Sequence, residues 1–228
     1  GLLVVGRTAT NGDGKIEVYG MDGELRWDLV GTDQGPSFGQ QIALGRDFTG
    51  DNVPDLVVAA PYATTTEPNG GRVFVFPGPL SSTLSMEDAS FIFEGGALDG
   101  QPGTTLALSP DLNGDGDAEL LIGNYRQALL IFGGSTGTHG LESASVIWEL
   151  NTGGGAWHFA TDTDQDGDGL PEVVLGMDTY GSGAGIVAWS YSSSLINRSD
   201  PWIFQGALDR QVLGSAGQGI GSKLTLVQ

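Results

Sequence analysis

One nine-residue pattern occurs three times in this chain and limits the folds it can adopt more than any other feature. It reads DFTGDNVPD from Asp47, DLNGDGDAE from Asp111 and DQDGDGLPE from Asp164, so each copy starts and ends on an acidic residue. An apolar run follows each copy. The copies begin roughly 60 residues apart, a period that fits one four-stranded blade of a β-propeller better than one rung of a solenoid.

Short expected strands surround each copy. Bursts of β-branched and aromatic residues, separated by Gly, Pro, Asn and Asp, are typical of strands joined by turns. Besides the apolar run after each copy, the expected strands cover residues 42–44, 72–76, 90–93, 106–108, 128–132, 145–148, 159–160, 185–189 and 202–204. No long stretch has the periodicity of a helix, so the sequence predicts an all-β fold with almost no helix.

The two ends of the chain match different strands of the same unit. Residues 3–6, 15–19 and 25–30 read as its second, third and fourth strands, and residues 224–226 read as its first strand. Pairing of the terminal strands would leave no open sheet edge. We therefore expect one β-propeller domain over residues 1–228 with four blades of four antiparallel strands. The expected blades are 36–101, 102–152, 153–214 and one shared by 1–35 and 215–228. The alternative is a piece of a longer propeller.

The repeated acidic loops predict calcium sites. Calcium takes six to eight oxygen ligands, and the alternating side chains of a tight loop converge on one point. Clustered carboxylates also repel one another unless a cation lies among them. Positions 1, 3, 5 and 9 would offer side chains and position 7 its backbone carbonyl. The expected ligands are Asp47, Thr49, Asp51, Val53 and Asp55; Asp111, Asn113, Asp115, Asp117 and Glu119; and Asp164, Asp166, Asp168, Leu170 and Glu172, for about three calcium ions per chain.

The first loop departs from the pattern, and none of the loops fits an EF-hand. Thr49 is a weaker ligand than a carboxylate, and Asn52 replaces a glycine, so we expect this loop to bind calcium most weakly. Asn52 still tolerates the left-handed conformation that the turn requires. An EF-hand loop needs a bidentate Glu at position 12, where this chain has Val58, Ile122 and Leu175. The remaining alternative is a surface turn without metal.

The first copy and its neighbours resemble a known family. Phe38-Gly39, followed by DFTGDNVPDLVVAA and Pro61, is similar to the FG-GAP repeat of integrin alpha-chain propellers and related bacterial surface proteins. In the second unit the same place holds Pro102-Gly103. The resemblance implies an extracellular, calcium-stabilised propeller used for adhesion or ligand binding. Integrin-type propellers have seven blades, so four blades would be a departure from the family.

Composition excludes several functions. The chain has 28 acidic and 9 basic residues and a formal charge of −19, which argues against a nucleic-acid or anionic-membrane partner. It has no cysteine, which removes disulfides, zinc–thiolate sites and thiol nucleophiles. No apolar run approaches the length of a membrane span. The histidines, His139 and His158, accompany no nucleophile motif, so we expect no enzymatic activity.

These observations favour a secreted interaction module. We expect a monomer located outside the cell or at its surface, with the periplasm as a further option, that binds an unknown protein or glycan ligand. The alternatives are a carbohydrate-binding or polysaccharide-degrading domain, and a structural spacer in a large surface protein. Blade packing would explain the tryptophans, whereas a carbohydrate-stacking face is the competing interpretation for Trp27, Trp148, Trp157, Trp189 and Trp202.

Overall fold

The computed structural model describes part of the chain, and the fold is stated for that part. The described residues are 1–10, 12–35, 37–96, 101–140, 143–149, 157–162, 164, 169–180, 184–190 and 202–205, with the backbone alone for 149 and for 177 onward. Helical structure among them is limited to short 3-10 segments, of which Met86–Asp88 is described in full. The predicted all-β class is confirmed.

The strands form repeated antiparallel sheets. The first sheet contains β1 (Leu2–Arg7), β2 (Lys15–Gly20) and β3 (Leu25–Val30). The second contains β4 (Gln41–Arg46), β5 (Asp55–Ala60), β6 (Arg72–Phe76) and β7 (Phe91–Glu94). The third contains β8 (Thr105–Leu108), β9 (Leu120–Gly123), β10 (Gln127–Ile131) and β12 (Val146–Glu149). The fourth contains β13 (Trp157–Ala160), β14 (Val173–Tyr180), β15 (Ala184–Ser190) and β16 (Trp202–Gln205).

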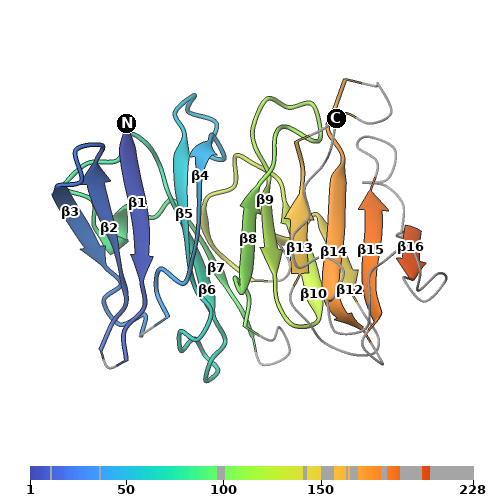
Figure 1. Ribbon diagram of the computed structural model, residues 1–228, viewed down its shortest axis with the longest axis horizontal. Coiled ribbons are helices and arrows are strands. Elements are labelled where there is room, and N and C mark those ends of the chain that lie inside the picture. The colour runs from blue at the N-terminus through green and yellow to red at the C-terminus, as the bar shows by residue number, and fades with distance from the viewer. Residues whose placement is uncertain are drawn as a thin grey trace.

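The second, third and fourth sheets contact one another through their first strands. Figure 1 shows them side by side, with β1–β3 at one end and β13–β16 at the other. β4 contacts β8, and β8 contacts β13. Arg46, at the end of β4, forms an ion pair with Asp162, which follows β13. The first strands of the second, third and fourth sheets therefore converge, as the inner strands of propeller blades do.

Closure of the ring stays a prediction. Among the described strands, β1 pairs with β2 alone. The residues expected to pair with β1, 224–226, lie outside the described residues. The number of blades and the four predicted blade boundaries are likewise not decided by the described strands.

Apolar cores fill the spaces between neighbouring sheets. β5 lies between two of these cores, so both of its faces are buried: Leu56 and Val58 face the first sheet, and Val57 and Ala59 face the third. A strand buried on both faces needs apolar residues at every position, which explains the uninterrupted runs after the acidic loops. Trp148 and Trp157 lie in the core between the third and fourth sheets, which confirms the packing interpretation for these two tryptophans.

The FG turn requires glycine because it touches the preceding sheet. Gly39 and Gly103 have φ angles of 85° and 87°. Their amides donate 3.0 Å hydrogen bonds to the carbonyls of Ala59 and Gly123, respectively. A β-carbon on Gly103 would lie 2.7 Å from that of Ala59, and one on Gly39 would lie 2.6 Å from the carbonyl oxygen of Lys15. Gly103 therefore has the same role as Gly39, although a proline replaces the phenylalanine of the motif before it.

One strand was not expected. Residues 133–140 carry no sequence motif, yet β11 (Gly137–His139) lies in this segment and pairs in parallel with β7 of the second sheet. The ring of His139 stacks on Phe91 with centroids 5.6 Å apart. The segment thus covers an open edge of the preceding sheet.

No helix in the described part of the chain has the length and apolar character needed to cross a membrane.

Candidate metal centres

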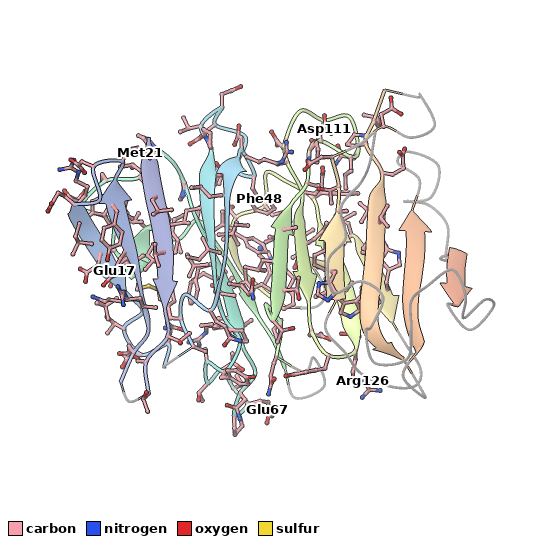
Figure 2. All side chains as sticks on the ribbon, viewed as in Figure 1. Glu17, Met21, Phe48, Glu67, Asp111 and Arg126 are labelled. Atoms are coloured by element: carbon pink, nitrogen blue, oxygen red, sulfur yellow. The ribbon has the colours of Figure 1, made fainter. Side chains whose placement is uncertain are left out.

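Each acidic loop joins the first and second strands of its sheet. The loops precede β5, β9 and β14, and Asp111 of the second loop lies at the upper edge of the molecule in Figure 2. One hydrogen bond recurs in all three: the amide five positions after the first aspartate donates to its Oδ2. These bonds are Asn52 to Asp47 at 2.6 Å, Gly116 to Asp111 at 2.8 Å, and Gly169 to Asp164 at 3.0 Å. In all three loops the residue five positions on is therefore held to the first carboxylate in the same way.

The second loop brings three acidic groups together. Asp111, Asp115 and Glu119 each offer an oxygen atom, and these atoms all lie within 4.8 Å of one another. The Asn113 side chain binds Asp115: its Nδ2 donates to Oδ2 at 2.8 Å, and its Oδ1 accepts from the Asp115 amide at 2.8 Å. Four of the five predicted residues of this loop thus meet through their side chains.

Glu119 has one carboxylate oxygen without a partner. Its side chain is fully buried at the start of β9. Oε2 accepts hydrogen bonds from the Leu112 amide at 2.8 Å and from the Ser109 hydroxyl at 3.1 Å. Oε1 is buried and has no hydrogen-bond partner in the described part of the chain. A buried carboxylate oxygen left unsatisfied is costly, so this arrangement calls for a cation or a proton.

Electrostatics at Glu119 lead to the same conclusion. The pKa of Glu119 is raised from its usual 4.5 to about 8; burial is the main cause, and the neighbouring charges of Asp111 and Asp115 act in the same direction. The hydrogen bonds from Leu112 and Ser109 oppose this change but do not cancel it. A positive ion among these acids would favour the ionised form of all three. The cluster offers only oxygen atoms, the donor set that suits calcium rather than zinc or copper.

The first loop forms an equivalent cluster with a more satisfied inner acid. Oxygen atoms of Asp47, Asp51 and Asp55 lie within 4.8 Å of one another. Asp55 is fully buried, and its Oδ2 accepts from the amides of Phe48 and Thr49 at 2.8 Å each. Its Oδ1 accepts from the Gly78 amide and from the Thr49 hydroxyl. These four bonds reduce the need of Asp55 for a cation.

The ranking of the loops by calcium affinity stays a prediction, and the hydrogen bonds of Asp55 are in line with it. Thr49, expected as a metal ligand, donates its hydroxyl to Asp55 at 3.3 Å. Burial raises the pKa of Asp55 above its usual value, and the backbone hydrogen bonds to its carboxylate oppose this change only in part. Asn52 has a φ angle of 66°, so the left-handed turn expected there is confirmed. The carbonyl role expected of Val53 stays a prediction.

The third loop is described only in part. Asp164 begins it, and Glu172 is fully buried immediately before β14, which matches the positions of Asp55 and Glu119. The predicted ligands Asp166 and Asp168 lie outside the described residues. Leu170 lies within them, and its carbonyl role stays a prediction.

Sequence reasoning missed two contributions to these sites. Ser109 precedes the second loop and binds Glu119, and neither other loop has a serine at the equivalent place to suggest a pattern. Asp117 was expected to contribute its carbonyl alone. Its carboxylate instead lies against the first loop, where a β-carbon on Gly50 would be 3.0 Å from both of its oxygens.

Two family models match the chain. The FG-GAP repeat matches residues 38–76, from the FG turn through the first acidic loop to the end of β6. The FG-GAP-like repeat matches residues 111–175, a segment that contains the second and third acidic loops.

Proposed function

Because this chain contains an FG-GAP repeat and an FG-GAP-like repeat, we propose that it is an extracellular β-propeller that binds calcium in its acidic loops and contacts a protein or glycan ligand. The observation that carries the proposal is the buried Oε1 of Glu119 beside Asp111 and Asp115, which has no hydrogen-bond partner among the described residues. A turn without metal would have to keep this carboxyl group protonated. Proteins with these repeats are typically extracellular or surface-exposed, where calcium is abundant.

Calcium in this proposal stabilises the fold rather than taking part in chemistry. Each loop closes a hairpin between two strands, and an ion there would hold the hairpin to its first aspartate. Extracellular modules bind calcium with dissociation constants near 0.1–1 mM. At about 1 mM calcium and a dissociation constant of about 0.1 mM, each site contributes roughly 1.4 kcal/mol to the free energy of unfolding.

The end of the molecule opposite the loops is the proposed contact surface. Tyr62 directly follows Pro61 after β5, and Tyr125 occupies the corresponding turn after β9; they are 38% and 45% exposed. A hydrogen bond with Tyr125 raises the pKa of the Tyr62 phenol, so the two side chains lie together. Arg126 is exposed at the same end, away from Asp111 (Figure 2), and forms no ion pair within the described residues. Tyrosine and arginine are enriched at protein interfaces.

A catalytic role has less support. Most carboxylate oxygens of the first two loops accept hydrogen bonds from their own loop. Among the described residues, Nε2 of His139 lies 2.7 Å from the Thr136 carbonyl, and its ring stacks on Phe91. No nucleophile motif accompanies either histidine. We therefore propose a binding module without enzymatic activity.

Two measurements test this function. Isothermal titration calorimetry of the native chain should give calcium binding, and Glu119→Gln should lose one site. A labelled native chain is then applied, in about 1 mM calcium, to an array of glycans and extracellular matrix proteins. Tyr125→Ala and Arg126→Ala should weaken any binding, whereas Met21→Ala, at an exposed position of the first sheet, should not. Calcium binding with no partner on any array would favour the structural spacer.

A further inference from the structure

The first and second acidic loops contact each other directly. The amide of Ala118 donates a 2.7 Å hydrogen bond to the carbonyl oxygen of Asp47. The amide of Gly134 donates a second 2.7 Å bond to the carbonyl oxygen of Phe48. Ala118 belongs to the second loop and Gly134 to the turn after β10, so both bonds join the start of the first loop to backbone of the next repeat.

The carboxylate of Asp117 lies at this contact. A β-carbon on Gly50 would be 3.0 Å from both Oδ1 and Oδ2, so the carboxylate rests on the turn of the first loop. The amide of Gly50 donates a 2.7 Å bond to Oδ1 of Asp47, the first acid of that loop. No basic side chain in the described part of the chain pairs with Asp117. Its charge therefore faces two acidic loops at once.

We propose that the first two loops bind calcium as a coupled pair and that Asp117 is the positioning residue that couples them. The inference rests on the proposed calcium function. Asp117 belongs to the second loop through its backbone and contacts the first loop through its side chain. An ion in the second loop fixes the backbone of Asp117, which places its carboxylate on Gly50. The first loop is then ordered before its own ion arrives, so part of the ordering cost is removed and binding becomes tighter.

Charge decides the sign of the coupling. Two divalent ions repel each other, which by itself makes the second ion bind more weakly. The carboxylate of Asp117 offsets this repulsion only because the first ion fixes it on Gly50; a carboxylate fixed there at all times would attract each ion equally with or without the other. Asp117→Asn keeps the size of the side chain and removes the charge. The variant should therefore lose the positive coupling and retain both ions.

The order of filling follows from the inner acids. Glu119 has an unpartnered oxygen, whereas both oxygens of Asp55 accept hydrogen bonds. The second loop should therefore bind first and the first loop second. Allosteric coupling between sites commonly changes affinity about 5- to 150-fold, so filling the second loop should tighten the first at least fivefold.

The experiment is a calcium titration of the whole chain, followed by the amide NMR signals of Gly50 and Gly114, which report the two loops separately. Asp115→Asn removes an exposed ligand of the second loop and should weaken binding at Gly50 at least fivefold. Asp164→Asn is the matched control, because it removes a ligand of the third loop and should leave the Gly50 titration unchanged. In Asp117→Asn, the amide signals of Gly50 and Gly114 should both still respond to calcium. The calcium affinity reported by Gly50 should no longer depend on whether the second loop is filled.

The outcomes separate this inference from the proposed function. If the Gly50 titration is the same in the native chain, Asp115→Asn and Asp117→Asn, the loops bind independently and the coupling is wrong, although calcium binding stands. If neither glycine responds to calcium in the native chain, the calcium function itself is wrong and the coupling with it. Far-UV circular dichroism of each variant confirms that a lost response does not come from unfolding.

Discussion

The hydroxyl of Ser109 donates a 3.1 Å hydrogen bond to Oε2 of Glu119, while Oε1 of the same carboxylate has no partner among the described residues. Ser109 is itself fully buried. The serine thus fixes one side of a buried acid and leaves the other side available to the cluster of Asp111 and Asp115. The charge and burial of Glu119 and its position beside Asp111 and Asp115 are the main reasons to expect a cation at this site.

Glu119→Gln should remove one calcium ion and its stabilising effect. The glutamine keeps the shape of the side chain but lacks the charge that attracts a divalent ion. The variant should lose roughly 1.4 kcal/mol of calcium-dependent stability at about 1 mM calcium. Thermal unfolding with calcium and with EDTA measures this difference. Glu87→Gln, an exposed acid outside the loops, is the control, and an equal calcium response in Glu119→Gln and the native chain would count against the site.

The stability of the metal-free chain should fall as the pH rises from about 5 to 8. The pKa of Glu119 is raised from 4.5 to about 8 in the folded chain, so the folded state holds a proton that the unfolded state releases. The contribution of this group is therefore complete below about pH 4.5 and is lost as the pH rises through about 8. Burial also raises the pKa values of Asp55 and Asp117, so their contributions to stability should change with pH in the same direction.

Calcium should suppress this pH dependence, because an ion favours the ionised carboxylates. Below about pH 8, calcium binding should also release protons, which calorimetry in buffers of different ionisation enthalpy detects. Melting curves between pH 5 and 9, with EDTA or with calcium, are the direct measurement. If the melting temperature changes with pH in the same way in EDTA and in calcium, Glu119 does not face the ion.

An opposite pH dependence is expected in the first sheet. Lys15, Tyr19 and Arg7 all bind Glu17 and lower its pKa to about 2. Since the pKa is lower in the folded chain, the stabilisation is present above about pH 4.5 and is lost as the pH falls through about 2. Glu17→Gln should therefore lower the melting temperature at pH 7, by an amount that shrinks toward pH 2. Glu24→Gln, an exposed acid of the neighbouring turn, is the control; a constant difference at every pH would contradict this account.

Two glycines with similar backbone angles should differ in their tolerance of alanine. Gly23 has a φ angle of 83° in a hairpin turn and nothing within 4 Å of an added β-carbon, so Gly23→Ala should cost about 1–2 kcal/mol of backbone strain alone. Gly103 has a φ angle of 87° and would also place its β-carbon 2.7 Å from that of Ala59. Gly103→Ala should cost about 2–4 kcal/mol, the sum of strain and overpacking. Denaturant unfolding in EDTA measures both, and equal costs would remove the role assigned to the FG turn.

Much of the fold could be predicted because its determinants are local. β5 and β9 are buried on both faces, so their apolar runs stand out in the sequence, and the acidic loops are marked by fixed spacing. β11 had no such signal, because Gly137-Thr138-His139 joins the second sheet through backbone pairing that three residues do not encode.

The candidate sites were predictable in their residues but not in their contacts. The hydrogen bond from Thr49 to Asp55 and the contact of Asp117 with Gly50 depend on how side chains meet after folding. Spacing identifies which residues could be ligands. It does not say that Asp55 is already satisfied by Gly78, a residue far from the loop in the sequence.

Native mass spectrometry of the intact chain, in calcium and after EDTA, tests the central claim most directly. The account predicts calcium ions bound to each chain, about three in number, that are removed by EDTA and reduced by one in Glu119→Gln. A chain that carries no calcium at about 1 mM, the concentration that suits extracellular modules, would contradict it.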